Sequence, residues 1–289
     1  MRKFLKKIKY LTEYFIVITF LKIIGLFGID RAAEICSFIA RKIGILLAVN
    51  EIARRNIKAI FGDMFDIEKT IEKTWDNFGR FIGEFAYVNT MDELELERRI
   101  EIIGMDNIEK LNGQPFLLFT GHFANWDVAL KLIHKFYPKF NIIYRKANNP
   151  YVNRLINESR ASDKLSLIPK GPDGSRALIK AIKKRESIAM LVDQKMNDGI
   201  EVPFLGRPAM TANAIAKIAL QYGYPIVPCQ IIRKKGSYFR AIVHPALSFK
   251  QTGNNKIDSY NIMVNINQHL GEWVKQNPSQ WFWFHNRWK

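Results

Sequence analysis

The chain has 289 residues, with 44 lysines and arginines against 27 aspartates and glutamates, so its net charge is +17. This length allows one large domain or two small ones, and no linker, low-complexity tract or internal repeat divides it. The charge favours an anionic partner such as nucleic acid, lipid headgroups or an acidic protein, although a lysine-rich proteome would give the same excess. Cys36 and Cys229 lie far apart without ligand-like neighbours, which indicates neither a disulfide framework nor a metal site.

The first 30 residues combine a basic start with an apolar run at 14–29 that Lys22 interrupts. This run is short for a membrane-spanning helix, which needs about 20 predominantly apolar residues. No small-residue cleavage site follows it, so we expect it to be retained. We therefore predict that residues 1–30 form a helix lying in a membrane surface, with its lysines on anionic headgroups. A buried first helix of the core is the alternative.

Residues 31–289 are predicted to form a single α/β domain that begins with helices over 31–60 and 68–90. Aromatic and aliphatic residues recur at steps of three and four on one face of the second helix. They are Trp75, Phe78, Phe81, Ile82 and Phe85. Such a stripe is typical of core packing, and it would also suit the wall of an apolar tunnel.

The segment from Pro115 to Leu130 carries the strongest signal in the chain. Its apolar stretch 116–119 lies between glycines and predicts a buried strand, and helical spacing begins near Asn125. His122 and Asp127 flank this junction. On a regular helix two residues five apart point about 140° away from each other, so a bend is needed to bring them together. If His122 lies in the loop, the Asp127 carboxylate can orient its ring, as a general base requires.

The sequence around His122 and Asp127 allows two roles for this pair. In the first, His122 is a structural histidine and Asp127 complements the dipole of the helix. In the second, the two form a catalytic pair. Unpaired backbone N–H groups at the helix start, near Asn125, would then face a developing oxyanion.

Strands and helices alternate through the rest of the chain, which predicts a largely parallel central sheet with helices on both faces. Ligands of such sheets gather at the carboxyl ends of the strands. His122, Arg145 and Asp193 each follow a predicted strand. We therefore expect all three to lie at the edge of the sheet formed by the carboxyl ends of the strands, which we call the rim. Lys170 and Arg176, from the turn at 170–176, are expected to add positive charge there.

Several of these segments together resemble one family. The GHFANWD motif at 121–127, a histidine followed by four residues and an acidic residue, resembles that of the bacterial lipid A biosynthesis acyltransferases, relatives of the glycerolipid acyltransferases. Arg145, followed by Asn-Pro and Arg154, is similar to the second block of that family. Asp193-Gln194, VPFLG at 202–206 and an alanine-rich helix expected to be capped at Thr211 resemble a third. The aromatic ending QWFWFHNRWK resembles the usual C-terminus of the family. By physics alone it suits a membrane interface or a buried terminal strand equally.

The resemblance implies an enzyme that transfers a fatty acyl chain from an acyl carrier protein thioester to a hydroxyl of a Kdo-bearing lipid A precursor. It implies His122 and Asp127 as catalytic residues. The substrate-binding residues that it implies are Asn125, Arg145, Arg154, Asp193, Gln194 and Glu201. Glu201 replaces the aromatic residue usual before Val-Pro-Phe in hexa-acylating transferases, a departure that bears on substrate choice.

No metal or cofactor is expected, and the expected partners are the carrier protein, the lipid precursor and an anionic membrane surface, with no nucleic acid. The expected location is the cytoplasmic face of the inner membrane. A glycerolipid or glycolipid acyltransferase, acting on lysophosphatidate or a mannoside, is the alternative within the same chemistry. A non-enzymatic basic protein that binds membrane or nucleic acid is the alternative from another class, but the sequence has no nucleic-acid recognition motif.

Overall fold

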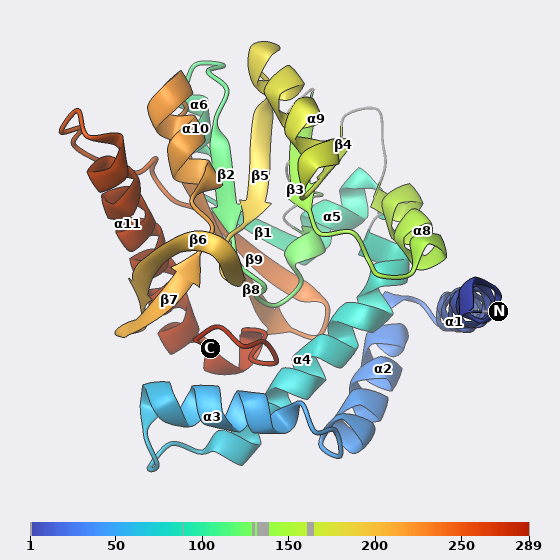
Figure 1. Cartoon of the computed structure of the whole chain (residues 1–289). Helices are drawn as coiled ribbons and strands as arrows, with labels where there is room; N and C mark the ends of the chain where they lie inside the picture. Colours follow the sequence, from blue (N-terminus) through green and yellow to red (C-terminus); the bar gives the residue numbers. More distant parts are fainter. Residues whose placement is uncertain (1, 89, 129–130, 132–138, 161–164, 289) are drawn as a thin grey trace.

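The computed structural model describes residues 2–88, 90–128, 131, 139–160 and 165–288 (Figure 1). A seven-stranded sheet forms its centre, in the order β1-β9-β8-β2-β5-β3-β4. The strands in that order are Ile100–Ile103, Tyr238–Val243, Ile226–Lys235, Leu117–Thr120, Ser187–Leu191, Phe140–Tyr144 and Leu165–Pro169. Neighbouring strands are parallel except for β8 and β9, which are antiparallel.

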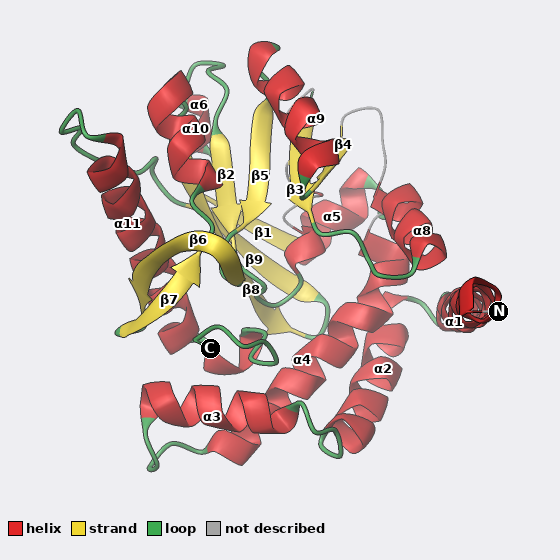
Figure 2. Ribbon diagram, in the orientation of Figure 1, coloured by secondary structure: helices red, strands yellow, loops and turns green. Residues whose placement is uncertain are grey.

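Helices cover both faces of this sheet (Figure 2). The helices are α1 Arg2–Ile24, α2 Ile29–Gly44, α3 Asn50–Phe61, α4 Ile67–Val88, α5 Glu93–Arg99, α6 Asp106–Glu109, α8 Pro150–Arg160, α9 Pro172–Lys183, α10 Ala214–Tyr222 and α11 Asn255–Gln276, and a 3-10 turn spans Pro278–Gln280. The helix expected at 31–60 is thus divided into α2 and α3. The mostly parallel sheet between helices is confirmed.

The central strand β2 shows why a continuous apolar run folds in this way. All four of its residues are buried. Leu117 and Phe119 join a core cluster with residues of α9, α10 and α11, whereas Leu118 joins a second cluster with residues of α5 and α6. Because successive side chains point to opposite faces, a strand covered on both sides needs apolar residues at every position.

Helices α2 and α4 pack at close backbone distance because α4 carries glycines at the contact. A Cβ atom at Gly79 would lie 2.5 Å from the carbonyl oxygen of Cys36, and one at Gly83 would lie 2.4 Å from that of Ala32. On the same helix the indole of Trp75 is buried and donates a hydrogen bond to Asn50 over 2.8 Å. Trp75, the first residue of the aromatic stripe, therefore belongs to the hydrophobic core.

Helix α1 lies at the edge of the molecule, beside α8 and α4 (Figure 1). Asn149, just before α8, donates a hydrogen bond of 2.8 Å to the carbonyl oxygen of Tyr10. Several large apolar side chains of α1 are exposed, among them Phe4, Phe15 and Ile16. In the described part of the chain, every helix is too short or too polar to span a bilayer.

One local expectation is wrong. Thr211 does not cap a helix, because it is the last residue of β7 (Arg207–Thr211), which pairs with β6 (Lys195–Phe204) in an antiparallel hairpin. The helix that follows begins at Ala214, after Asn213. The sequence also predicts that the helix starting near Asn125 carries His134 and is stopped by Pro138, but both residues lie outside the described part of the chain.

Candidate active site

The predicted rim is formed by three adjacent parallel strands. β5 lies between β2 and β3, so the carboxyl ends of these strands are neighbours. His122 follows the end of β2, Asp193 follows the end of β5, and Arg145 comes directly after β3. The structure therefore places these three residues at one edge of the sheet.

His122 contacts the carboxylate of Asp193. Its ring atom Nδ1 lies 2.7 Å from Asp193 Oδ1, and its backbone N–H donates to Oδ2 over 2.8 Å. The Asp193 side chain has no exposed surface, whereas one fifth of the His122 side chain is exposed. Burial opposes ionisation of Asp193, but the charge and hydrogen bond of His122 hold its pKa well below the usual range. This carboxylate orients the ring, and among the described residues Nε2 of His122 has no hydrogen-bond partner.

Asp127 does not contact His122, which corrects the expectation from their spacing. Helical backbone begins at Trp126, so Asp127 lies in the first turn. Its buried carboxylate instead pairs with Arg160, whose Nη2 lies 2.8 and 2.9 Å from the two oxygens. No motif in the sequence points to Arg160, and the family resemblance implies that Asp193 binds the substrate rather than His122.

This ion pair gives a prediction about stability. Asp127 is 1% exposed and Arg160 is 16% exposed. Breaking a buried pair leaves one charge without compensation, so Asp127→Asn should lower the free energy of unfolding by about 3 kcal/mol. Glu158→Gln breaks the exposed Arg154–Glu158 pair and is the control, with a much smaller expected loss because exposed ion pairs contribute little. Urea unfolding measures both, and equal losses would contradict the assignment.

Asn125 holds the loop rather than facing a substrate. Its Oδ1 accepts the N–H of Asp127 over 3.1 Å, and its Nδ2 donates to the buried carboxylate of Glu84 over 2.8 Å. Glu84 also pairs with the guanidinium of Arg233 and accepts a hydrogen bond from Ser237. Since Asn125 is fully buried, its side chain contributes by anchoring the start of the helix to α4 and β8.

The remaining predicted residues differ in how close they lie to the rim. Arg145 is exposed at the end of β3. Arg154 is exposed on α8, where it pairs with Glu158 over 2.7 Å. Gln194 is half-buried and follows Asp193 directly, whereas Glu201 lies on the exposed face of the β6–β7 hairpin.

Lys170 places a second positive charge near Arg145. It follows the end of β4, the strand beside β3, and its backbone N–H donates to the carbonyl oxygen of Tyr144 over 2.7 Å. Desolvation lowers the pKa of its ammonium group, which also interacts electrostatically with Asp193 and Arg145. Positive charge thus faces the rim from two adjacent strands.

Comparison with known proteins identifies the family. The sequence profile described as bacterial lipid A biosynthesis acyltransferase matches residues 1–289. The chain belongs to this family. It is therefore an acyltransferase of lipid A biosynthesis, and the non-enzymatic alternative is wrong.

Among solved structures, the chain is similar to the 1-acyl-sn-glycerophosphate acyltransferase PlsC from Thermotoga maritima. The two are 15% identical, with a TM-score of 0.34, over 80% of this chain and 97% of that one. A search of curated proteins found no match.

Aromatic rings extend from His122 of this lipid A acyltransferase along α4. The ring of Trp126 lies 4.9 Å from that of His122 and 4.0 Å from that of Phe81. Phe78 stacks near Phe81 and lies 5.3 Å from Phe282. These four aromatic residues are only half-buried, so the stripe predicted on α4 continues as an apolar surface beside His122.

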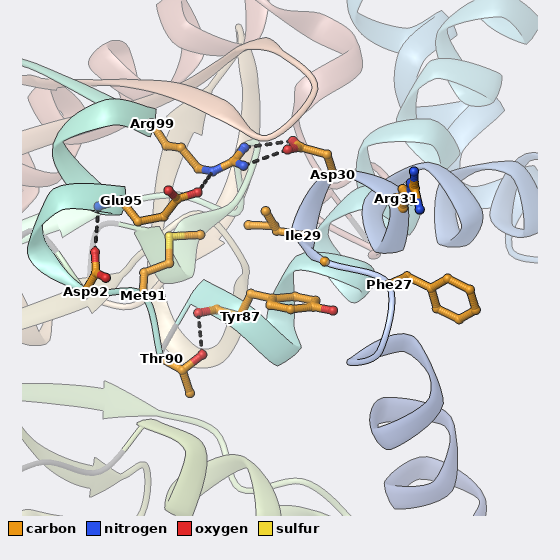
Figure 3. A pocket seen from close by; sticks show the side chains of 11 residues that line it. Phe27, Ile29, Asp30, Arg31, Tyr87, Thr90, Met91, Asp92, Glu95 and Arg99 are labelled. Carbon is orange, nitrogen blue, oxygen red and sulfur yellow. Dashed lines mark hydrogen bonds and ion pairs between the residues drawn. The ribbon is translucent and has the colours of Figure 1, made fainter.

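A separate cavity of about 580 Å³ lies between the α1–α2 turn and the junction of α4 with α5 (Figure 3). The buried guanidinium of Arg99 faces it and pairs with Asp30 over 2.7 Å and with Glu95. Tyr87 and Met91 also line it. His122 and Asp193 are not among its lining residues, so this cavity plays no part in the site described above.

Burial affects the protonation of His285, close to Asp193. Both of its ring nitrogens are inaccessible and have no hydrogen-bond partner within the described residues. Burial lowers its pKa from 6.5 to about 4, against an opposing effect of Asp193 and with smaller lowering effects of His122 and Arg287. The folded acyltransferase therefore holds His285 neutral near neutral pH.

This gives a pH prediction with a defined sign. Below pH 6.5 the unfolded chain binds a proton at His285 that the folded chain does not bind until about pH 4. Stability should therefore fall as the pH decreases across this window, by about 3 kcal/mol for this residue. His285→Gln should show a correspondingly flatter pH dependence in chemical unfolding between pH 7 and 4. Parallel curves for the two proteins would contradict the assignment.

Proposed function

We propose that this enzyme transfers a fatty acyl chain from an acyl carrier protein thioester to a hydroxyl of a Kdo-bearing lipid A precursor. Membership of the family supports the acyl transfer and the lipid A pathway. The observation that carries the mechanism is the contact between His122 Nδ1 and the buried carboxylate of Asp193. It fixes one ring nitrogen and leaves the other available for proton transfer.

In the proposed reaction, Nε2 of His122 takes the proton of the acceptor hydroxyl as its oxygen attacks the thioester carbonyl. Asp193 stabilises the imidazolium that forms. The tetrahedral intermediate then expels the thiolate of the carrier, which receives the proton from His122. The products are an ester and a free thiol.

Transfer of the acyl chain directly from the carrier to the acceptor agrees with the burial of the two cysteines. Cys36 and Cys229 are buried, and burial raises the pKa of their thiols to about 11 and about 12. A thiol with such a pKa stays protonated near neutral pH and is a poor nucleophile. The acyl chain therefore passes to the acceptor without an acyl-cysteine intermediate.

The loop after His122 offers backbone donors for the oxyanion. The N–H groups of His122, Phe123, Ala124 and Asp127 already donate to other groups. Among the described hydrogen bonds, none uses the N–H of Asn125–Trp126. These two amides lie at the start of the helix and are our candidates for stabilising the negative oxygen of the intermediate.

The surroundings of His122 suggest where the substrates lie. Arg145 and Lys170 provide the positive charge for a phosphate of the carrier or the lipid. The aromatic surface of Phe78, Phe81 and Trp126 provides an apolar wall for the acyl chain. Asp127 keeps a supporting role through Arg160.

We also propose that α1 binds the cytoplasmic face of the inner membrane, where both lipid and carrier can be reached. The lysines on its first turns are exposed beside exposed apolar side chains. A basic residue near an anionic surface contributes about 1 kcal/mol to binding. Changing Lys3, Lys6, Lys7 and Lys9 to glutamine should weaken binding to anionic vesicles by about three orders of magnitude.

The matched control for that experiment changes four exposed lysines outside α1. They are Lys183, Lys184, Lys250 and Lys256. Sedimentation with vesicles of anionic and of zwitterionic lipid compares the two quadruple variants. Equal weakening by both sets would show that net charge, rather than α1, governs binding.

The substrate assignment is tested by offering the purified enzyme different acceptors with an acyl carrier protein thioester. A mass increase of one acyl chain on the Kdo-bearing precursor is expected. Lysophosphatidate and a mannoside represent the glycerolipid and glycolipid alternative. Faster transfer to either of them than to the precursor would replace the proposed acceptor.

A further inference from the structure

The aromatic segment Trp281–Trp288 lies far from His122 in sequence, yet it reaches the catalytic residues. The indole Nε1 of Trp281 donates a hydrogen bond of 2.8 Å to Oδ2 of Asp193. This oxygen also accepts the backbone N–H of His122, while the other oxygen faces the His122 ring. Three donors thus define the orientation of one buried carboxylate.

The backbone of the same segment is joined to the loop that carries His122. Phe282 donates its N–H to the carbonyl oxygen of His122 over 3.1 Å, and Ala124 donates to that of Gln280 over 2.9 Å. Phe123 and Trp281 form an antiparallel bridge between these two bonds. The segment therefore holds both members of the histidine–carboxylate pair, one through its backbone and the other through an indole.

The indole of Trp281 cannot easily move. It is fully buried, and its ring packs against those of Phe204, Trp283 and His285 at centroid distances of 5.6, 4.6 and 5.0 Å. The backbone before it is fixed to β8, because the Gln280 side chain exchanges two hydrogen bonds with the backbone of Arg233. Because the indole of Trp281 is held rigidly, its N–H restricts the orientation of the Asp193 carboxylate that accepts it.

We propose that Trp281 is a positioning residue of the acyltransferase, whose indole N–H holds Asp193 in the orientation that places its free oxygen on Nδ1 of His122. This inference rests on the proposed role of His122 as the general base. Without the N–H donor, the carboxylate can rotate about its side-chain bonds, and the imidazole loses its alignment with the acceptor hydroxyl. Trp281 does not touch the substrate, so the effect should appear in kcat rather than in KM.

The test is Trp281→Phe, which removes the N–H and keeps an aromatic ring. We expect kcat to fall at least tenfold, with KM changed less than twofold. The matched control is Trp283→Phe: Trp283 is equally buried in the same segment, but its indole donates to the carbonyl oxygen of Pro278 over 2.7 Å. This control should lower kcat less than threefold.

A double-mutant cycle separates positioning from packing. If Trp281 acts through Asp193, adding Trp281→Phe to Asp193→Asn should lower kcat less than twofold further. The same fold loss in both backgrounds would show a packing role and overturn the inference. Wild-type kcat in Asp193→Asn alone would instead refute the proposed mechanism.

Thermal melting of each variant shows whether it folds. If Trp281→Phe does not fold, benzothienylalanine at position 281 replaces the N–H by sulfur in a ring of the same shape. The expected loss in kcat is again at least tenfold. Wild-type kcat with this residue would overturn the inference.

Discussion

Replacing His122 by alanine should lower kcat/KM by about three orders of magnitude, because a positioned general base contributes about 10²- to 10⁴-fold to proton transfer. The acceptor hydroxyl would then have to attack the thioester without losing its proton to the enzyme. Release of the carrier thiol, measured with a saturating thioester and a defined precursor, checks this result.

The control for this substitution is His269→Ala on α11. His269 is also half-buried, but its ring Nδ1 lies 3.0 Å from the carbonyl oxygen of Asn265 and has no carboxylate partner at hydrogen-bond distance within the described residues. We expect a loss below threefold. If His122→Ala keeps activity near that of the control, the general-base mechanism is wrong.

The second large effect is expected for Asp193→Asn, which should lower kcat by about 10²- to 10⁴-fold. The amide has the size of the carboxylate, but it has no charge to stabilise the imidazolium, and its NH₂ group can turn the ring to the wrong tautomer. In contrast, Asp127→Asn should act chiefly on stability, because Asp127 is bound to Arg160.

Comparing the two variants in the same assay distinguishes between the two carboxylates. Asp193→Asn should be the more severe variant at a temperature at which both are folded. A larger loss of kcat in Asp127→Asn would show that the neighbour in sequence, rather than the neighbour in space, supports catalysis.

The general fold could be predicted because its signals are local. An apolar stretch between glycines forms β2, and alternating strands and helices produce a mostly parallel sheet. The rim followed from the same argument, since His122, Arg145 and Asp193 each come just after a strand.

The partner of His122 could not be predicted in this way. Asp193 lies 71 positions further along the chain, and the two meet only because β2 and β5 are neighbours in the sheet. Sequence periodicity predicts strands, but it does not specify their order. The short spacing to Asp127 indicated a contact, but the Asp127 carboxylate pairs with Arg160 instead.

The β6–β7 hairpin was missed for a different reason. Its two turn residues, Leu205 and Gly206, both have positive φ, at 51° and 77°. Leucine is rarely found in this conformation, so the sequence carries a weak turn signal there. Thr211 resembles a helix cap, but its hydroxyl accepts a hydrogen bond from the buried Arg287 over 2.7 Å. That contact depends on the C-terminal segment and has no local signature.

In the proposed mechanism, Asp193 holds the His122 ring with Nδ1 protonated, so that Nε2 can take a proton. Side-chain ¹⁵N NMR of histidine-labelled enzyme in detergent micelles measures this tautomer directly, and His122→Ala identifies the resonance. We expect the neutral imidazole to carry its proton on Nδ1, and the spectrum to change in Asp193→Asn but not in Asp127→Asn. A protonated Nε2, or a response to Asp127→Asn alone, would contradict it.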